Sequence, residues 1–492
     1  MLRRIFLILV LLTPSIASAD VDTKAVDRIM TKTMAAFHIP GAAVAIVQND
    51  RVVYAKGYGV TEMGGSTPVA ADTLFFIGST SKAFTTAAMA MLVDEKKMSW
   101  DDPVRKYIQY FHLDDPCADS LVTLRDIVSH RTGLSRHDEL WDNTPLTREQ
   151  IIRAIGSVKL SKPFRSTYQY QNIMFLTAGE AVAAASGVPW NDFVRTHIFQ
   201  PLGMKDTAIT MAEWNASKHA AGHRYDRKTD RVELQTIYDD DNIAPAGAIK
   251  ASARDMAQWL RFQLADGAIG GNRLLSADAL RETRMPQTVI RLEGETKLVN
   301  PVGNVLNYAM GWNVSDYDGA LLVGHGGALN GFRANVGLLP KQNAGFAVMI
   351  NLGRGYGTIA LRNSLADLLL GRPAKDWDAY YLAAEKQTDA KEDAARSERE
   401  AKRFRDTKPS RELGAYAGKY TSPGYGTATV ALENGALMLR WNRLAVPLRH
   451  FHFDTFRAES EPDDVDEEVA FQIGADGQVK SMTLFGEEFA RN

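Results

Sequence analysis

Strand-like sequence lies at both ends of the first 370 residues, and helical sequence lies between. Residues 41–59, GAAVAIVQNDRVVYAKGYG, hold two runs of β-forming residues around an Asn-Asp pair, which is typical of a β-hairpin. Strand-like runs return far along the chain, at residues 320–323, 334–339 and 345–352. This arrangement predicts one sheet that is built from distant segments and packed against a mostly helical region.

The helical region begins with a strongly apolar segment. Residues 83–92, AFTTAAMAML, are apolar on nearly every face of a helix, so we expect this helix to be buried. Between about residues 100 and 290, helical patterns alternate with Pro and Gly turns, as at residues 151–155 and 255–264. The predicted fold class is therefore α+β or α/β, with a sheet flanked by helices.

The composition changes after Gly371. Residues 386–405 are dense in Lys, Arg, Asp, Glu and Ala, which is typical of an exposed helical connector, with a disordered linker as the alternative. Beyond Pro409, short runs of alternating hydrophobicity adjoin Gly-containing turns, as in residues 434–441 and 469–477. About 80 residues of this kind predict a separate small β-barrel or β-sandwich domain.

The N-terminal residues match an export signal. Arg3 and Arg4 precede an apolar run over residues 5–12, and residues 17–19, Ala-Ser-Ala, form a small-residue cleavage pattern. We therefore expect a secretory signal peptide over residues 1–19 and a periplasmic or secreted mature chain, with a retained N-terminal anchor as the alternative. Elsewhere, no segment approaches the roughly 18 apolar residues of a spanning helix, so we expect no membrane span after signal removal.

Charge, length and cysteine content narrow the class of protein. The formal net charge is −2, or about −4 without Arg3 and Arg4, so there is no basic footprint for nucleic acid. A mature chain of about 470 residues exceeds what one core usually supports, which predicts two domains. Cys117 is the single cysteine, so no intramolecular disulfide can form. Acidic neighbours raise a thiol pKa, so we expect no catalytic role for this cysteine.

Ser79 and Lys82 form an S-x-x-K motif where the segment FFIG meets the apolar helix. Three residues are nearly one helical turn, so the two side chains share one face. A buried lysine there has a lowered pKa and can act as a base for the serine, and the N–H groups of the helix start can face an oxyanion. About one S-x-x-K match is expected by chance, and Ser79 as an N-cap beside a solvated Lys82 is an equal alternative.

Tyr170 and Asn172 form a Y-x-N motif just before a second apolar helix. If that helix packs on the first, the Tyr170 phenol can point at Ser79, and a nearby ammonium would favour its phenolate. The Asn172 amide can hold a substrate carbonyl. The alternative for Tyr170 is a packed tyrosine with a satisfied hydroxyl.

His325, Gly326 and Gly327 form an H-x-G motif directly after a predicted strand. The two glycines allow a substrate to approach the backbone closely. The Ala328 N–H could then pair with the Ser79 N–H as an oxyanion hole. An ordinary strand-end histidine is the alternative for His325.

With these motifs, STSK, YQN and HGG in that order, the chain resembles the serine hydrolases related to class C β-lactamases, penicillin-binding proteins and DD-peptidases, the peptidase S12 type. The likeness extends over most of residues 25–370. The other matching fragments are LRDIVSHRTGL (124–134), FQPLGMKDT (199–207), PAGAIKASARDMAQWL (245–260) and YAMGW (308–312).

The resemblance implies a β-lactamase/transpeptidase-like fold, in which a mixed sheet lies beside a helical domain with the site between them. It makes Ser79 the acylated nucleophile, Lys82 its base partner and Tyr170 the second acid/base. It also makes Asn172 a substrate-binding amide and residues 325–327 the substrate-binding edge-strand element. The tail resembles the lipocalin-like β-domain appended to some members of this family.

We therefore expect four segments along the chain. They are a signal peptide over residues 1–19, a hydrolase domain over 20–371, a charged connector over 372–410 and a β-domain over 411–492. There is no G-x-S-x-G elbow and no H-E-x-x-H motif, and we expect neither a metal nor another cofactor. The histidines without convincing metal spacing are His130, His137, His450 and His452.

One departure from the family pattern bears on the substrate. Class C β-lactamases usually carry lysine-threonine-glycine where this chain has His325, and an imidazole is mostly neutral above pH ~6.5. The resemblance then favours an exported serine hydrolase of esters, amides or D-amino-acid peptides. The alternatives are a β-lactamase or DD-carboxypeptidase, or a non-catalytic binder of cell-wall peptides or β-lactams. A small molecule or peptide is the expected partner, and the oligomeric state stays open.

Overall fold

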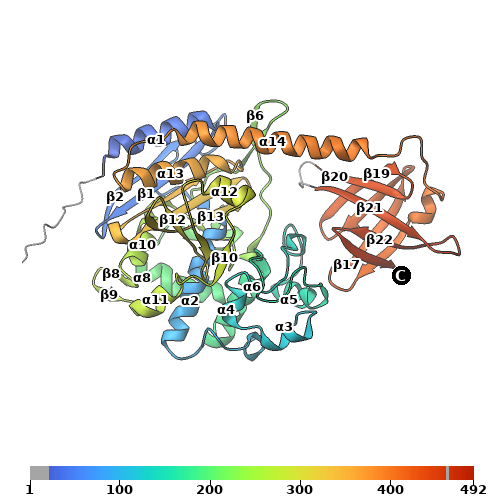
Figure 1. The fold of residues 1–492 in the computed structure, drawn as a ribbon. Helices are drawn as coiled ribbons and strands as arrows, with labels where there is room; N and C mark the ends of the chain where they lie inside the picture. The colour runs from blue at the N-terminus through green and yellow to red at the C-terminus, as the bar shows by residue number, and fades with distance from the viewer. Residues whose placement is uncertain (1–20, 461–464) are drawn as a thin grey trace, which may run out of the picture.

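The structure is a computed structural model that describes residues 21–460 and 465–492 (Figure 1). The predicted signal peptide over residues 1–19 lies outside these residues. The central element is an eight-stranded sheet in which every pair of neighbouring strands is antiparallel. The mixed sheet that the resemblance implied is therefore wrong in this detail. In spatial order its strands are β10 (Thr288–Ile290), β11 (Leu306–Tyr308), β12 (Asn313–Tyr317), β13 (Ala320–Leu329), β14 (Phe332–Leu339), β15 (Ala344–Ile350), β1 (Gly41–Gln48) and β2 (Arg51–Gly59).

The first hairpin joins the two ends of the hydrolase region. Asn49 and Asp50 adopt φ of 52° and 60°, the left-handed turn conformation that matches the twist of β1 and β2. β1 is buried along its whole length and pairs with β15 on its other side, 300 residues further along the chain. This pairing confirms that one sheet is built from distant segments.

Three helices cover one face of the sheet (Figure 1). They are α1 (Thr23–Ala36), α13 (Tyr356–Leu369) and the first turns of α14 (Trp377–Ala401). Their apolar side chains form one core with the side chains of β1 and β15 that point to this face.

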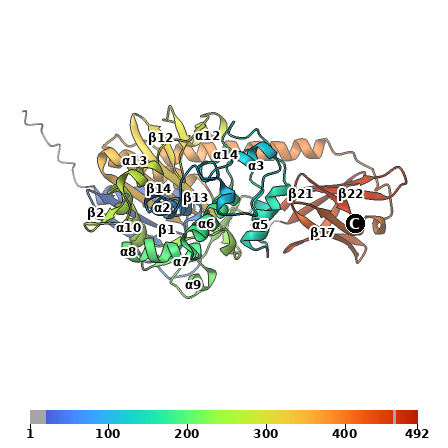
Figure 2. The same cartoon turned by 90° about the horizontal axis from the view of Figure 1, so that it is seen from below.

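The other face carries the helical region. α2 (Lys82–Asp94) is buried from Lys82 to Leu92, which confirms the expected core helix. α6 (Asn172–Ser186) packs beside α2, and α10 (Ala253–Leu264) lies on β1 and β15 (Figure 2). Shorter elements here are α3 (Pro116–Leu121), α4 (Leu124–Ile127), α5 (Arg148–Ala154), α7 (Trp190–Val194), α8 (Gln200–Leu202), α9 (Met211–Asn215), α11 (Ala277–Glu282), β3 (Phe75–Phe76), β4 (Thr207–Ala208), β7 (Lys250–Ala251), β8 (Ala268–Ile269) and β9 (Asn272–Arg273). Three other short elements pack against the core under α1, α13 and α14: β5 (His223–Asp226), β6 (Arg231–Leu234) and α12 (Gly294–Val299).

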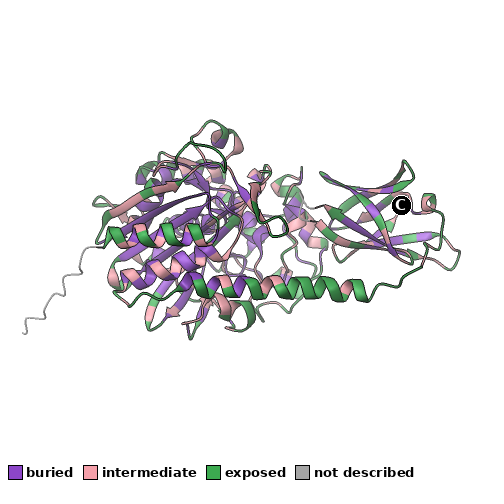
Figure 3. Cartoon of the chain, turned by 90° about the horizontal axis from the view of Figure 1, so that it is seen from above, coloured by how far each residue is buried: buried purple, intermediate pink, exposed green. Residues whose placement is uncertain are grey.

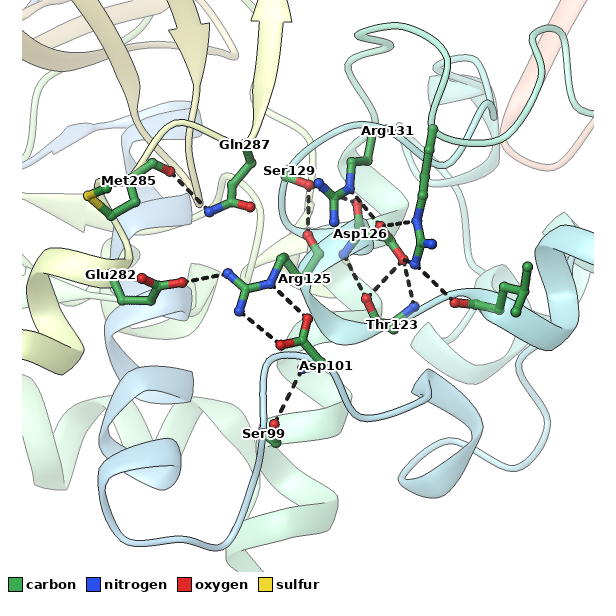
Figure 4. A network of polar contacts seen from close by, with 12 residues as sticks. Ser99, Asp101, Thr123, Arg125, Asp126, Ser129, Arg131, Glu282, Met285 and Gln287 are labelled. Atoms are coloured by element: carbon green, nitrogen blue, oxygen red, sulfur yellow. Dashed lines mark hydrogen bonds and ion pairs between the residues drawn. The ribbon is translucent and has the colours of Figure 1, made fainter.

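A buried carboxylate fixes the segment that leads to the site (Figure 4). Asp126 forms a capping box with Thr123 at the start of α4 and accepts hydrogen bonds from Arg131 (2.6 Å) and Arg165 (2.6 Å). Burial by itself would raise the Asp126 pKa, but these hydrogen bonds outweigh it, and the pKa is lowered. The network holds in place the next residues of the chain, among them His130.

α14 links the hydrolase region to the C-terminal domain. Its first turns are buried, and its second half is exposed as it crosses to that domain (Figure 3). The helix confirms the helical interpretation of residues 386–405, although it begins earlier, at Trp377, and ends at Ala401. Considered alone, no helix in the described ranges is long and apolar enough to span a membrane. α6 and the segment Trp190–Leu202 together have the length and composition of a span, as a pair bent by 78°.

The C-terminal domain is a closed β-barrel, which confirms the prediction of a small barrel. In β18, every second side chain is buried, because successive residues of a strand point to opposite faces. The strands, in order around the barrel, are β16 (Gly418–Ser422), β17 (Gly426–Glu433), β18 (Ala436–Trp441), β19 (Leu444–His452), β20 (Thr455–Ser460), β21 (Val465–Ile473), β22 (Val479–Leu484) and β23 (Glu487–Arg491).

Candidate active site

Two glycines bring the start of α2 against β13. Gly78 has φ of 52°, and a Cβ there would lie 2.3 Å from the Ala328 amide nitrogen. A Cβ on Gly327 would lie 1.9 Å from the Ile77 carbonyl oxygen. Any larger side chain would force the two backbones apart. The contact places Ser79, in the short 3₁₀ turn before α2, beside Ala328, the residue predicted to share its oxyanion hole.

Lys82 is fully buried, so the alternative of a solvated first-turn lysine is wrong. Its Nζ lies 2.9 Å from Ser79 Oγ, 2.7 Å from Asn172 Oδ1 and 2.9 Å from the Ala246 carbonyl oxygen. The amide and carbonyl oxygens can only accept hydrogen bonds. In its neutral form the amine would donate its two N–H groups to these oxygens, and its lone pair would then face the Ser79 hydroxyl.

The charge state of Lys82 follows from its surroundings. Burial lowers the Lys82 pKa well below its ordinary value, and the positive charge of Arg136 lowers it further. The negative charge of Asp138 opposes these effects only in part. The expected fall of the lysine pKa is therefore present, and an amine with a lowered pKa can act as a base.

Asn172, at the first position of α6, links Lys82 to Asp138. Its Oδ1 accepts from Lys82, and its Nδ2 donates to Asp138 Oδ1 at 3.1 Å. Asp138 also accepts from Trp141 Nε1 at 2.7 Å and forms an ion pair with Arg136 at 2.5 Å. One N–H of the Asn172 amide is left for a substrate carbonyl, the role predicted from sequence.

Tyr170 lies over the same site. Its ring centre is 4.7 Å from Lys82 Nζ and 4.2 Å from the ring centre of His130. Burial raises the Tyr170 pKa, and the nearby Ser79 hydroxyl lowers it by less. The expectation that a nearby ammonium favours the phenolate is therefore wrong, because desolvation is the larger effect. Tyr170 presents a neutral hydroxyl that can donate a proton.

His325, on β13, uses both ring nitrogens within the protein. Nδ1 lies 2.6 Å from the Gly326 carbonyl, which only accepts, so Nδ1 carries the proton and Nε2 accepts from the Tyr308 hydroxyl at 3.0 Å. Burial lowers the His325 pKa to about 3, although the hydrogen bond to the Gly326 carbonyl opposes this shift. His325 is thus a neutral group that fixes the geometry of the β13 edge.

These groups line one cavity of about 540 Å³, which suits a small molecule or a short peptide. The structure brings Ser79, Tyr170, Asn172 and residues 325–328 together along its wall, with Lys82 buried behind Ser79. Other polar residues that line it include Arg136, Asp138, Tyr168, Arg333 and Asn335. Within the described residues, no cluster of His, Cys, Asp or Glu side chains is arranged to hold a metal ion.

Sequence reasoning missed Arg136 and Asp138. They lie in the segment SRHDELW, which has no hydrophobic periodicity, and only the fold brings it to Asn172. Tyr308 was part of a matched fragment, YAMGW, but nothing in the sequence tied its hydroxyl to His325.

The arrangement can perform acyl transfer, because it holds a hydroxyl nucleophile, a neutral amine base and a phenolic acid within one cavity. Residues 26–370 match the Beta-lactamase family. The chain belongs to this family. Residues 402–491, which include the barrel, match a domain of unknown function, DUF3471.

Relatives of this Beta-lactamase family member include enzymes with a hydrolase name. The chain is 30% identical over 444 residues to "Unguisins hydrolase ungD'" of Aspergillus campestris, an alignment that covers 84% of this chain and 79% of that protein. It is 25% identical to "Protein flp" of Staphylococcus aureus over 67% of this chain and 63% of that protein. These homologues, with the family match, establish a serine hydrolase of this superfamily.

A solved structure supports the fold over nearly the whole chain. The octameric penicillin-binding protein homologue from Pyrococcus abyssi superposes with a TM-score of 0.64 at 22% identity. The superposition covers 96% of this chain and 100% of that one. At this identity the likeness concerns the fold alone, and it confirms the penicillin-binding-protein-like architecture.

Proposed function

We propose that this family member is an exported serine hydrolase that cleaves esters, amides or D-amino-acid peptides through an acyl-enzyme on Ser79. The observation that carries the proposal is the buried Lys82 amine. Two acceptors hold its N–H groups, and its lone pair faces Ser79 Oγ at 2.9 Å. A non-catalytic binder has no need for a desolvated base in this position.

In the acylation step, Ser79 Oγ attacks the substrate carbonyl carbon while Lys82 Nζ takes its proton. The carbonyl oxygen becomes an oxyanion, for which the Ser79 and Ala328 N–H groups are the proposed donors. As the intermediate collapses, the bond to the leaving group breaks and the Tyr170 hydroxyl supplies a proton to that group. A water molecule then attacks the acyl carbon and gives a proton to the Tyr170 oxygen. As the bond between Ser79 Oγ and the acyl carbon breaks, Lys82 returns its proton to Ser79, so all three groups regain their starting states.

The state of His325 bears on the substrate class. A neutral imidazole, with both nitrogens bonded to Tyr308 and Gly326, supplies no charge for a substrate carboxylate. This supports esters or amides without an obligatory carboxylate. The name of the unguisins hydrolase relative is consistent with a hydrolase of this kind.

A second candidate, hydrolysis of β-lactams or cell-wall peptides, is favoured by Arg333 on β14. Its guanidinium lines the cavity and donates to the Phe332 carbonyl at 3.0 Å. Within the described residues it has no acidic partner, and burial lowers its pKa to about 10. It remains a cation at neutral pH and could bind a substrate carboxylate.

The test is a panel of p-nitrophenyl esters, D- and L-amino acid anilides and nitrocefin, run on the wild type and on Ser79→Ala. We expect clear turnover of short-chain esters or D-amino acid anilides and slow turnover of nitrocefin. A fluorophosphonate should label Ser79 in the wild type and should not label Ser79→Ala. Equal labelling of the two proteins would reject the nucleophile, and nitrocefin turnover equal to that of the best ester would favour the second candidate.

N-terminal sequencing of exported protein should find cleavage after Ala19.

A further inference from the structure

The C-terminal barrel reaches the segment that carries Arg136 and Asp138. The Tyr425 hydroxyl, in the turn between β16 and β17, lies 2.7 Å from His137 Nδ1. Glu139 interacts with the same phenol. The barrel therefore contacts the residue on each side of Asp138, while Asp138 itself bonds to Asn172 in the catalytic cavity.

The bonds of His137 continue toward the start of α6. His137 Nε2 lies 2.9 Å from Ser135 Oγ, and the Ser135 carbonyl accepts from the Gln171 side chain. Gln171 is the N-cap of α6 and lies between Tyr170 and Asn172. Hydrogen bonds thus lead from the barrel through His137 and Ser135 to Gln171, the residue between Tyr170 and Asn172.

The conformation of the segment makes such an anchor useful. His137 has φ of 45°, a left-handed conformation that costs about 1–3 kcal/mol for a residue with a side chain. Around it the chain forms only a one-turn 3₁₀ helix, Asp138–Leu140, so regular structure does little to hold it. Arg136, which lies 5.2 Å over the Tyr170 ring, depends on the same backbone.

A close approach of the two backbones supports the contact. A Cβ on Gly424 would lie 2.7 Å from Val158 Cγ2 and 3.3 Å from the Ala154 carbonyl oxygen, just after α5. Only a residue without a side chain lets the turn sit this close. At the far end of α14, Arg399 pairs with Asp466 of the barrel at 2.7 Å, so the domain is held at two places.

We propose that Tyr425 is a positioning residue for the hydrolase: the barrel, through Tyr425 and His137, holds Arg136 and Asp138 in place for catalysis. The phenol acts through these residues and does not touch the substrate. The proposal rests on the proposed acyl-enzyme function, and it gives the barrel a part in that function. It also predicts that removal of a single hydroxyl outside the hydrolase domain changes turnover.

The test uses Tyr425→Phe in the full chain, with Tyr420→Phe as the matched control. Tyr420 also lies in the barrel and loses one buried hydrogen bond, from its hydroxyl to the Tyr416 carbonyl at 2.7 Å, but it is remote from His137. Because one hydrogen bond is lost, kcat for a short p-nitrophenyl ester should fall about two- to tenfold in Tyr425→Phe with KM nearly unchanged. Rates are divided by the amount of fluorophosphonate-labelled protein, so that a loss of folded protein does not lower the measured kcat. Tyr420→Phe should keep the wild-type kcat.

Two further measurements separate positioning from general stability. Amide hydrogen exchange of residues 134–143 should accelerate in Tyr425→Phe and stay at the wild-type rate in Tyr420→Phe. The double variant Tyr425→Phe/His137→Gln should lose no more kcat than His137→Gln, because both changes break the same bond. Equal kcat losses in the two tyrosine variants, unchanged exchange in Tyr425→Phe, or additive losses in the double variant would each overturn the proposal. If the wild type takes no label and shows no turnover, the proposed function fails, and the exchange measurement still tests the positioning by the barrel.

Discussion

Replacement of Lys82 tests the central feature of the site. Lys82→Met keeps the length of the buried side chain and removes the amine, and Lys82→Arg keeps a cation and hydrogen-bond donors. A guanidinium cannot lose its proton in a protein, so arginine cannot act as a base. If Lys82 works as a neutral base, both variants should lose the same amount of kcat. If its role is electrostatic, Lys82→Arg should keep most of its kcat.

The magnitude follows from the contacts of the amine. A positioned base is worth about 10²–10⁴ in rate, which corresponds to about 3–5 kcal/mol in the activation barrier. Lys82→Met also leaves the Asn172 amide oxygen and the Ala246 carbonyl oxygen without this donor, at about 1–3 kcal/mol each. Removal of a buried polar amine offsets part of this cost. The fold should therefore survive while kcat falls by about 10²–10⁴.

The assay is hydrolysis of a p-nitrophenyl ester, together with the rate of fluorophosphonate labelling of Ser79 and thermal unfolding. Lys250→Met is the matched control, because Lys250 is also fully buried but its Nζ donates to the Ile209 carbonyl at 2.6 Å, away from the cavity. Its kcat per folded molecule should stay within about threefold of the wild type, since it makes no contact in the site. A Lys82→Arg variant within tenfold of the wild type would refute the neutral-base mechanism.

Further predictions concern the acid, the pH dependence and the support of the site. Tyr170→Phe should lower kcat about 10²–10⁴-fold for an amide and less for a p-nitrophenyl ester, whose leaving group needs no proton; equal losses would count against an acid role. The His325 pKa is lowered, so protonation below pH 6.5 favours the unfolded chain, and the free energy of unfolding should fall by up to about 1.4 kcal/mol per pH unit from this group as pH drops toward 3. Urea unfolding at several pH values should show that the free energy of unfolding depends less on pH in His325→Gln than in the wild type. An identical pH dependence would contradict the assignment. Asp126→Asn should destabilise the protein by about 3–5 kcal/mol, because two arginines lose their buried partner; a change below 1 kcal/mol in urea unfolding would disagree.

The sequence predicted the parts of the structure that depend on local pattern. The hairpin of residues 41–59 has two runs of β-forming residues around a turn pair, and the core helix after Ser79 is apolar on nearly every face, so both could be predicted. Ser79, in the 3₁₀ turn, and Lys82, at the start of α2, are three residues apart, so their contact is local. Asp138 could not be assigned a role, because its partner Asn172 lies 34 residues away, beyond α5 and two irregular segments.

The burial of charged groups was also beyond the sequence. The motif identified His325 as a neutral group at neutral pH. The extent to which its pKa falls depends on burial by several elements that are distant in the sequence. Burial also explains why the Tyr170 pKa is raised and not lowered as expected. It disfavours the phenolate, and a neutral Lys82 amine carries no charge that would favour it. Desolvation is a property of the packed cavity, and no spacing along the chain reports it.

The contacts at the start of α14 lead to a last prediction, which concerns where the chain can be truncated without unfolding the hydrolase domain. Trp377 and Tyr381 fall within the connector predicted over residues 372–410, yet both are buried against α1 and α13. The Trp377 indole donates to Asp367 at 2.7 Å, and the Asn363 amide donates to the Tyr381 hydroxyl at 2.9 Å.

A chain that ends at Gly371 would therefore lose part of the core. Two buried aromatic side chains remove about 300–500 Å² from water, worth about 8–12 kcal/mol as an upper bound. This is comparable with the whole stability of a domain, about 5–15 kcal/mol, so this chain should be unfolded or insoluble. A chain that ends at Ala401 keeps these contacts and loses only the barrel, so it should unfold cooperatively, with kcat lowered if the barrel positions residues 136–138. Circular dichroism and ester turnover decide the matter: a soluble, cooperatively folded chain ending at Gly371 would show that the first turns of α14 are dispensable for the core.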